Sequence, residues 1–122
     1  MSVSAFDVVV IGAGPGGYVA AIRAAQLGLS TAVVERDQRF GGTCTLRGCI
    51  PTKALLRDAH LLHEVKKAVQ QGLLKTGAVD FDFEKIQARK NDIVAKSNRG
   101  VDYLFKKNKV TVFRGSAVLT SP

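Results

Sequence analysis

A glycine-rich turn between a β-branched run and an alanine-rich segment constrains the fold of this chain more than any other feature. The turn is Gly12-Ala-Gly14-Pro-Gly-Gly17, which fits the pattern GxGxxG. It directly follows Asp7–Ile11, a run typical of a buried parallel strand. It also opens a segment from Pro15 to Leu27 that is rich in strong helix formers and begins with a proline suited to a first turn. Strand, glycine turn and helix in this order predict the start of a parallel α/β fold.

Each glycine of the turn has a physical role in binding a dinucleotide. Gly12 permits the tight turn, Gly14 lets the backbone approach a pyrophosphate, and Gly17 allows close packing of helix on strand. A second strand is expected over Thr31–Glu35, and Glu35 lies 21 positions after Gly14. A carboxylate at that place accepts a hydrogen bond from a ribose hydroxyl and disfavours a 2′-phosphate. The alternative is a glycine turn without a ligand, but the agreement of strand, turn, helix and acid favours nucleotide binding.

The rest of the chain continues as helices and short strands of one domain, since 122 residues allow one core. After a loop from Arg36 to Phe40, helices are expected from Pro51 to about Gln70 and over Phe83–Lys107. A third strand is expected at Val110–Arg114, and Ala117–Thr120 is expected to begin a fourth. The second long helix has an apolar stripe made of Phe83, Ile86, Ile93, Val94, Val101, Leu104 and Phe105.

The charge is strongly positive, with 18 basic and 10 acidic side chains giving a net charge of +8. A basic chain can attract nucleic acid. Here the basic residues are scattered among acids at helical spacing, which favours a solvated face, and no arginine-rich run supports a nucleic-acid module. We see no signal peptide and no apolar stretch of the length a membrane span needs. We therefore expect a cytoplasmic protein that binds neither nucleic acid nor membrane.

Two cysteines, Cys44 and Cys49, leave three interpretations open. They are free thiols, half of a metal site completed by His60 and His63, or a redox disulfide. A metal site is disfavoured because the cysteines would have to reach over Pro51 and a helical turn or more. A disulfide requires Cα atoms about 4.4–6.8 Å apart, whereas five positions of straight helix rise about 7.5 Å. The segment therefore needs a distortion, which Gly48 and the pair at 41–42 supply.

The segment Gly41-Gly-Thr-Cys-Thr-Leu-Arg-Gly-Cys-Ile-Pro-Thr-Lys-Ala-Leu-Leu56 closely resembles the pyridine nucleotide–disulfide oxidoreductases. The resemblance covers the whole chain, including Tyr103–Val110 and Arg114–Ala117, and is greatest to members that oxidise dihydrolipoamide. It implies an α/β, Rossmann-like FAD-binding fold with a parallel sheet, of which residues 1–122 form an N-terminal part. We expect the NAD and interface domains of the family to be absent from these residues, and the 122 residues alone to be inactive.

The resemblance also implies site residues and partners. Cys44 would be the thiol that exchanges with the substrate dithiol, and Cys49 the thiol nearer the flavin. The implied FAD contacts are Gly12, Gly14, Gly17, Glu35, Arg36, Gly42, Thr43, Lys53 and Ala117, with no metal. NAD would be the electron acceptor. The partners would be dihydrolipoamide on lipoyl domains of 2-oxoacid dehydrogenase or glycine cleavage complexes, and a second subunit in a homodimer.

One departure from the family pattern lies between the cysteines. This chain has Thr45-Leu46-Arg47 where many relatives have an apolar residue, Asn and Val. We expect Arg47 to add positive charge beside the thiols, in addition to Lys53, which favours a thiolate at Cys49. Two alternatives to the dihydrolipoamide-oxidising enzyme stay open. One is a non-catalytic FAD- or nucleotide-binding module, and the other is a different disulfide reductase of the same family.

Overall fold

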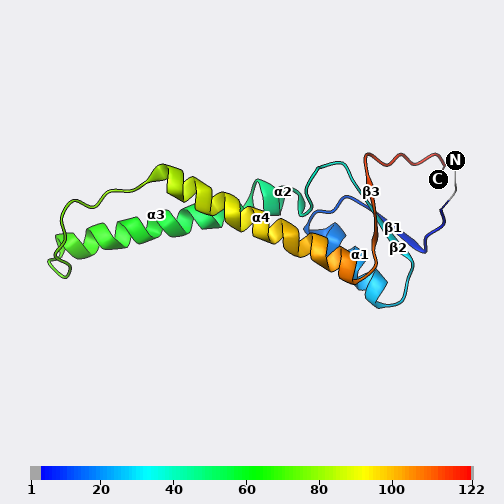
Figure 1. Ribbon diagram of the computed structural model, residues 1–122, viewed down its shortest axis with the longest axis horizontal. Coiled ribbons are helices and arrows are strands. Elements are labelled where there is room, and N and C mark those ends of the chain that lie inside the picture. Colours follow the sequence, from blue (N-terminus) through cyan, green and yellow to red (C-terminus); the bar gives the residue numbers. More distant parts are fainter. Residues whose placement is uncertain (1–3, 122) are drawn as a thin grey trace.

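A small parallel sheet forms one end of the molecule, and two long helices extend from it (Figure 1). The computed structural model describes residues 4–121. The sheet has the order β1-β2-β3, with strands at Val8–Ile11, Thr31–Glu35 and Thr111–Arg114. Both strand pairs are parallel, and the register aligns Val10 with Val33 and Val33 with Val112. The α/β class with a parallel sheet is thereby confirmed.

Four helices connect and extend the sheet: α1 at Pro15–Gln26, α2 at Gly42–Leu46, α3 at Cys49–Gln70 and α4 at Phe83–Lys107. Helix α1 crosses from β1 to β2, as the glycine turn predicts. Helices α3 and α4 run side by side as a long hairpin that projects away from the sheet (Figure 1). Arg89 on α4 donates two hydrogen bonds to the carboxylate of Asp58 on α3, at 2.8 and 2.9 Å.

The core lies on one face of the sheet, where α1 and the C-terminal part of α4 pack. Phe105 of α4 is 1% exposed and meets the ring of Phe40 edge to face, with ring centroids 5.0 Å apart. The buried cluster consists of Ala13, Ala21, Val33, Phe40, Val101, Phe105 and Val110. The end of α4 therefore anchors the loop between β2 and α2 to the sheet.

The opposite face of the sheet carries exposed apolar side chains. Val9, Ile11 and Phe113 are 52%, 58% and 43% exposed. Because side chains alternate between the two faces of a strand, these residues point away from α1. The expectation of fully buried strands was therefore wrong for β1, and only one face of this sheet is covered within residues 4–121.

Two other expectations differ from the structure. Residues 117–120 form no strand, because Gly115, at φ +147°, ends β3 and Val118 and Leu119 lie 81% and 83% exposed. On α4, Phe83 is 60% exposed because it lies at the start of the helix, in the part that projects away from the sheet, whereas the buried residues Val94, Val101 and Phe105 lie further along. None of the helices in residues 4–121 is both long and apolar enough to span a bilayer.

Candidate functional site

The glycine turn after β1 packs as the sequence predicts. A Cβ added to Gly17 would lie 1.9 Å from the carbonyl oxygen of Gly12, so no other residue fits there. Gly14 is the N-cap of α1, and Pro15 occupies the first helical position. The helix thus begins directly at the turn, where its first N–H groups have no intrahelical acceptors.

A second glycine pair interlocks with the first turn. The N–H of Gly41 donates to the carbonyl of Ala13 at 2.8 Å. Gly42 has a left-handed backbone with φ +58°, and a Cβ there would lie 2.8 Å from the Cα of Gly14. The start of α2 therefore rests directly on the turn between β1 and α1. The sequence predicted a role for Gly42 only through the family resemblance.

A cavity of about 410 Å³ lies at the carboxyl ends of the strands, where parallel sheets bind their ligands. Six of the nine predicted cofactor residues line it: Gly12, Glu35, Arg36, Gly42, Thr43 and Ala117. Gly14 and Gly17 shape the turn behind it. Asp37, Arg47 and Ser116 also line the cavity, and no sequence motif predicted their place there.

Glu35 is a buried carboxylate with two backbone partners. One oxygen accepts the N–H of Ala13 at 2.7 Å, and the other accepts the N–H of Asp37 at 2.8 Å. The residue is only 7% exposed. Because each carboxylate oxygen can accept two hydrogen bonds, both retain acceptor capacity for ribose hydroxyls. Glu35 therefore holds the glycine turn in addition to facing the cavity.

The cysteine segment has the distortion that a disulfide needs. Helix α2 ends at Leu46, Gly48 breaks the helical path with φ −122° and ψ −107°, and α3 begins at Cys49. Both cysteines are free thiols in this structure. The pairing itself therefore stays a prediction, whereas the predicted break between the two residues is confirmed.

The two thiols are close enough to influence each other. The pKa of Cys44 lies above its ordinary value, chiefly because of a hydrogen bond with the Cys49 side chain. Burial and the charge of an ionised Cys49 raise it further, whereas the positive charge of Lys53 lowers it. Lys53 lies on α3, about one turn after Cys49, with its side chain exposed. Its positive charge acts on the thiol of Cys44. Lys53 is not among the residues that line the cavity.

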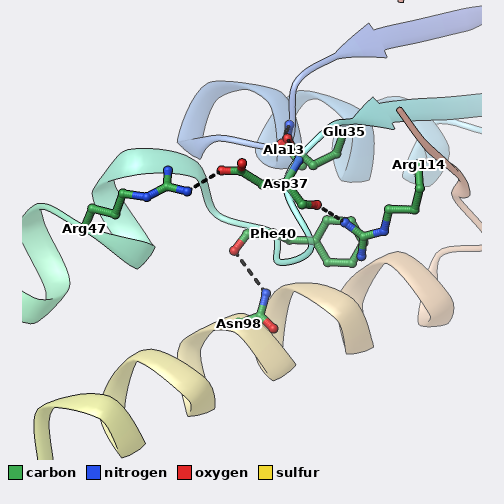
Figure 2. A network of polar contacts seen from close by, with 7 residues as sticks. All are labelled: Ala13, Glu35, Asp37, Phe40, Arg47, Asn98 and Arg114. Atoms are coloured by element: carbon green, nitrogen blue, oxygen red, sulfur yellow. Dashed lines mark hydrogen bonds and ion pairs between the residues drawn. The ribbon is translucent and has the colours of Figure 1, made fainter. Parts of the chain in front are cut away.

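The side chain of Arg47 contacts Asp37, whereas its charge was expected beside the two thiols. Figure 2 shows its guanidinium turned toward Asp37, where Nη2 donates to Oδ2 at 3.0 Å. Among the groups that shift the pKa of Cys44, Lys53 is the cation and Arg47 does not appear. The expectation that Arg47 acts on the thiols was therefore wrong for Cys44, because the side chain of Arg47 binds the carboxylate of Asp37 instead.

His60 and His63 lie exposed on α3. Within residues 4–121, no group of three or more His, Cys, Asp or Glu side chains is placed to hold a metal ion.

Comparisons with known proteins agree with the geometry. The family described as "Pyridine nucleotide-disulphide oxidoreductase" matches residues 6–122. The chain is 51% identical over 117 residues to a dihydrolipoyl dehydrogenase of Bacillus subtilis, covering 96% of this chain and 24% of that protein. It is 50% identical over 118 residues to one of Trypanosoma brucei brucei, covering 96% and 25%. A soybean (Glycine max) protein named leghemoglobin reductase is 49% identical over 116 residues, covering 95% and 22%. The chain thus spans about a quarter of the length of the curated relatives it matches.

Proposed function

Because this chain belongs to the pyridine nucleotide-disulphide oxidoreductase family, we propose that it is the disulfide-bearing part of a dihydrolipoyl dehydrogenase. In this role it binds FAD and carries electrons from dihydrolipoamide through Cys44 and Cys49. The observation that carries the proposal is a hydrogen-bonded pair of thiols on either side of a helix break. This segment begins with Gly42 and Thr43, which line a cavity together with Gly12 and Glu35.

The residues of the cavity fit the ADP part of FAD. The turn at Gly12 offers backbone close to the ligand, since no side chain intrudes there. Glu35 has lone pairs left for ribose hydroxyls, and Ala117 also lines the cavity. A cavity of about 410 Å³ falls within the range of small-molecule sites. FAD, when bound, supplies the two-electron chemistry that links a dithiol to NAD.

The cysteines perform the exchange with substrate. In the oxidised protein a Cys44–Cys49 disulfide is attacked by a thiolate of dihydrolipoamide, and a mixed disulfide forms at Cys44 while Cys49 leaves. The second substrate thiol then attacks the mixed disulfide, which releases oxidised lipoamide and leaves Cys44 and Cys49 reduced. Two electrons and two protons have then passed from substrate to protein. The positive charge of Lys53 stabilises thiolate in this pair, in line with its effect on the pKa of Cys44.

The finer assignments follow from the similarity to dihydrolipoyl dehydrogenases. We propose NAD as the electron acceptor, dihydrolipoamide on lipoyl domains as the donor, and a homodimer as the assembly. The named relatives support the donor, and the family name supports a pyridine nucleotide as acceptor.

The test is NADH formation by the full-length protein. With dihydrolipoamide and NAD, the wild type is expected to turn over, and Cys44→Ser and Cys49→Ser each abolish turnover. Lys106→Met, which removes an exposed ion pair with Asp102 on α4, is the matched control and retains activity. Thiol counting after denaturation accompanies the assay, because the reduced wild type should show two more free thiols than the oxidised wild type, and this difference should be absent from Cys44→Ser and Cys49→Ser. Bound FAD without turnover would favour a binding module, and turnover with another disulfide substrate alone would favour a different reductase.

A further inference from the structure

Asp37 connects the glycine turn to the segment between the cysteines. Its N–H donates to Glu35 at 2.8 Å, and its carbonyl accepts Nη1 of Arg114 at 2.6 Å. Its carboxylate accepts the guanidinium of Arg47 at 3.0 Å. Figure 2 shows these contacts converging on the loop between β2 and α2. Asp37 is thus fixed through its backbone on both sides, and its carboxylate is a fixed anchor for Arg47.

Arg47 is held by this anchor at the rim of the cavity. Its N–H donates to the carbonyl of Thr43 at 2.9 Å, so Arg47 follows Thr43 by one helical turn on the same side of α2. Its side chain is 62% exposed and lines the cavity together with Thr43 and Gly42. Asp37 receives one N–H of a guanidinium that has five, so the remaining donors are available to a ligand.

The charges of the cavity and of its expected ligand favour such a donor. Glu35 and Asp37 bring two carboxylates to the lining, and a dinucleotide brings a diphosphate. Like charges at short range disfavour binding unless cations offset them. Arg36 adjoins Glu35 in sequence, at the ribose end. Arg47 lines the cavity one helical turn after Thr43. Thr43 follows Gly42, which rests on the turn expected to approach the pyrophosphate.

We propose that Arg47 is a nucleotide-binding residue that donates hydrogen bonds to the diphosphate, and that Asp37 is the positioning residue that orients it. This inference rests on the proposed FAD site. An arginine suits the role because its planar guanidinium can donate to phosphate oxygens from some of its N–H groups while another N–H donates to a carboxylate. The residue therefore serves the cofactor, although it lies in the sequence between the two redox cysteines.

The test measures rebinding of FAD and of ADP to the full-length protein after FAD is stripped, at several salt concentrations. Arg47→Gln is expected to raise the dissociation constant of both ligands about three- to tenfold at low salt. This loss lies between that expected for an exposed ion pair and that expected for a charge-assisted hydrogen bond. It should also flatten the salt dependence of binding, because a screened cation–phosphate contact is lost. Arg47→Lys should restore part of both effects. Asp37→Asn should weaken binding less than Arg47→Gln, and less than additively when combined with it.

Lys106→Met is again the matched control, since it removes the same charge from an exposed ion pair on α4. The inference would be overturned if the Arg47→Gln variant bound FAD and ADP with the same affinity and the same salt dependence as this control. A variant with lower melting temperature and weaker binding but an unchanged salt dependence would also overturn it, because the role would then be structural. A wild-type protein that binds neither FAD nor ADP would instead overturn the proposed function itself.

Discussion

The carboxylate of Glu35 accepts the backbone N–H of Ala13 at 2.7 Å, across 22 positions of sequence. The acid expected to bind a ribose therefore also fixes the turn expected to bind the pyrophosphate. Its second oxygen fixes the loop after β2 through the N–H of Asp37. The conformations of the glycine turn and of the loop after β2 thus both depend on one buried side chain, independently of any ligand.

Glu35→Gln should destabilise the protein even without nucleotide. The amide keeps one acceptor oxygen, but its NH₂ group must face either the Ala13 or the Asp37 N–H, so a buried donor loses its acceptor. The expected loss is about 1–3 kcal/mol of unfolding free energy, measured by urea denaturation of the FAD-free protein. Asp7→Asn is the control, because Asp7 accepts one N–H from Ser30 at an exposed site. Equal effects of the two substitutions would show that Glu35 has no special role in the turn.

Gly17→Ala and Gly16→Ala should change stability in opposite directions. A Cβ at Gly17 would lie 1.9 Å from the carbonyl oxygen of Gly12, whereas a Cβ at Gly16 meets nothing within 4 Å. Gly16 is helical, so alanine there should stabilise the FAD-free protein by up to about 1 kcal/mol. Gly17→Ala must displace backbone and should lose well over that amount. Melting temperatures of the FAD-free variants measure both, and a tolerated Gly17→Ala would contradict the packing described.

The sequence predicted those parts of the fold that depend on local pattern. The three strands, α1 and α4 follow from β-branched runs, the glycine turn and helical periodicity, and their observed bounds differ by a residue or less. The strand at Ala117–Thr120 was wrong because a strand needs a paired neighbour, which a local run cannot reveal. The exposure of Phe83 could not be predicted for the same reason. Helical periodicity shows which residues share the apolar face of a helix, but it does not show which part of that face another element covers.

The positions of the site residues could be predicted where a motif determines the backbone conformation. The contacts of long, flexible side chains could not, because they depend on the folded loop. Gly12, Gly17 and Glu35 lie where the pattern places them. Arg47 was expected at the thiols because it lies between them in sequence. Its side chain is long enough to reach Asp37, ten positions away, and only the folded loop shows that partner.

Cys44 in the reduced protein should become more reactive when Cys49 is replaced. The pKa of Cys44 is raised chiefly by its hydrogen bond with Cys49, so Cys49→Ala should shift the pH midpoint of Cys44 alkylation downward. Lys53→Gln should shift it upward, because the charge of Lys53 lowers this pKa. Trypsin cleaves after Arg47, which separates the two cysteines in every variant, so mass spectrometry can follow each cysteine alone. Shifts of the same sign in both variants would contradict the electrostatic account.

Asp82 should make the stability of α4 depend on pH. As the N-cap, its side chain accepts the N–H of Lys85 at 3.0 Å, and it also pairs with the Lys85 ammonium at 3.2 Å. These contacts lower the pKa of Asp82 below its ordinary value of 3.8. A carboxyl whose pKa is lower in the folded state stabilises the protein above its unfolded pKa, and this stabilisation is lost as the pH falls through the folded pKa.

Asp82→Asn and Asp82→Ala separate the charge from the cap. Asparagine caps helices about as well as aspartate, so Asp82→Asn should melt slightly below the wild type at neutral pH and together with it at strongly acidic pH. Asp82→Ala should melt lower than both at neutral pH, because the Lys85 N–H then has no side-chain acceptor. Asp80→Asn is the control, since Asp80 lies two residues earlier, outside the helix. Melting followed by circular dichroism measures the series. A gap between wild type and Asp82→Asn that stays constant down to acidic pH would show that the charge of Asp82 does not stabilise the start of α4.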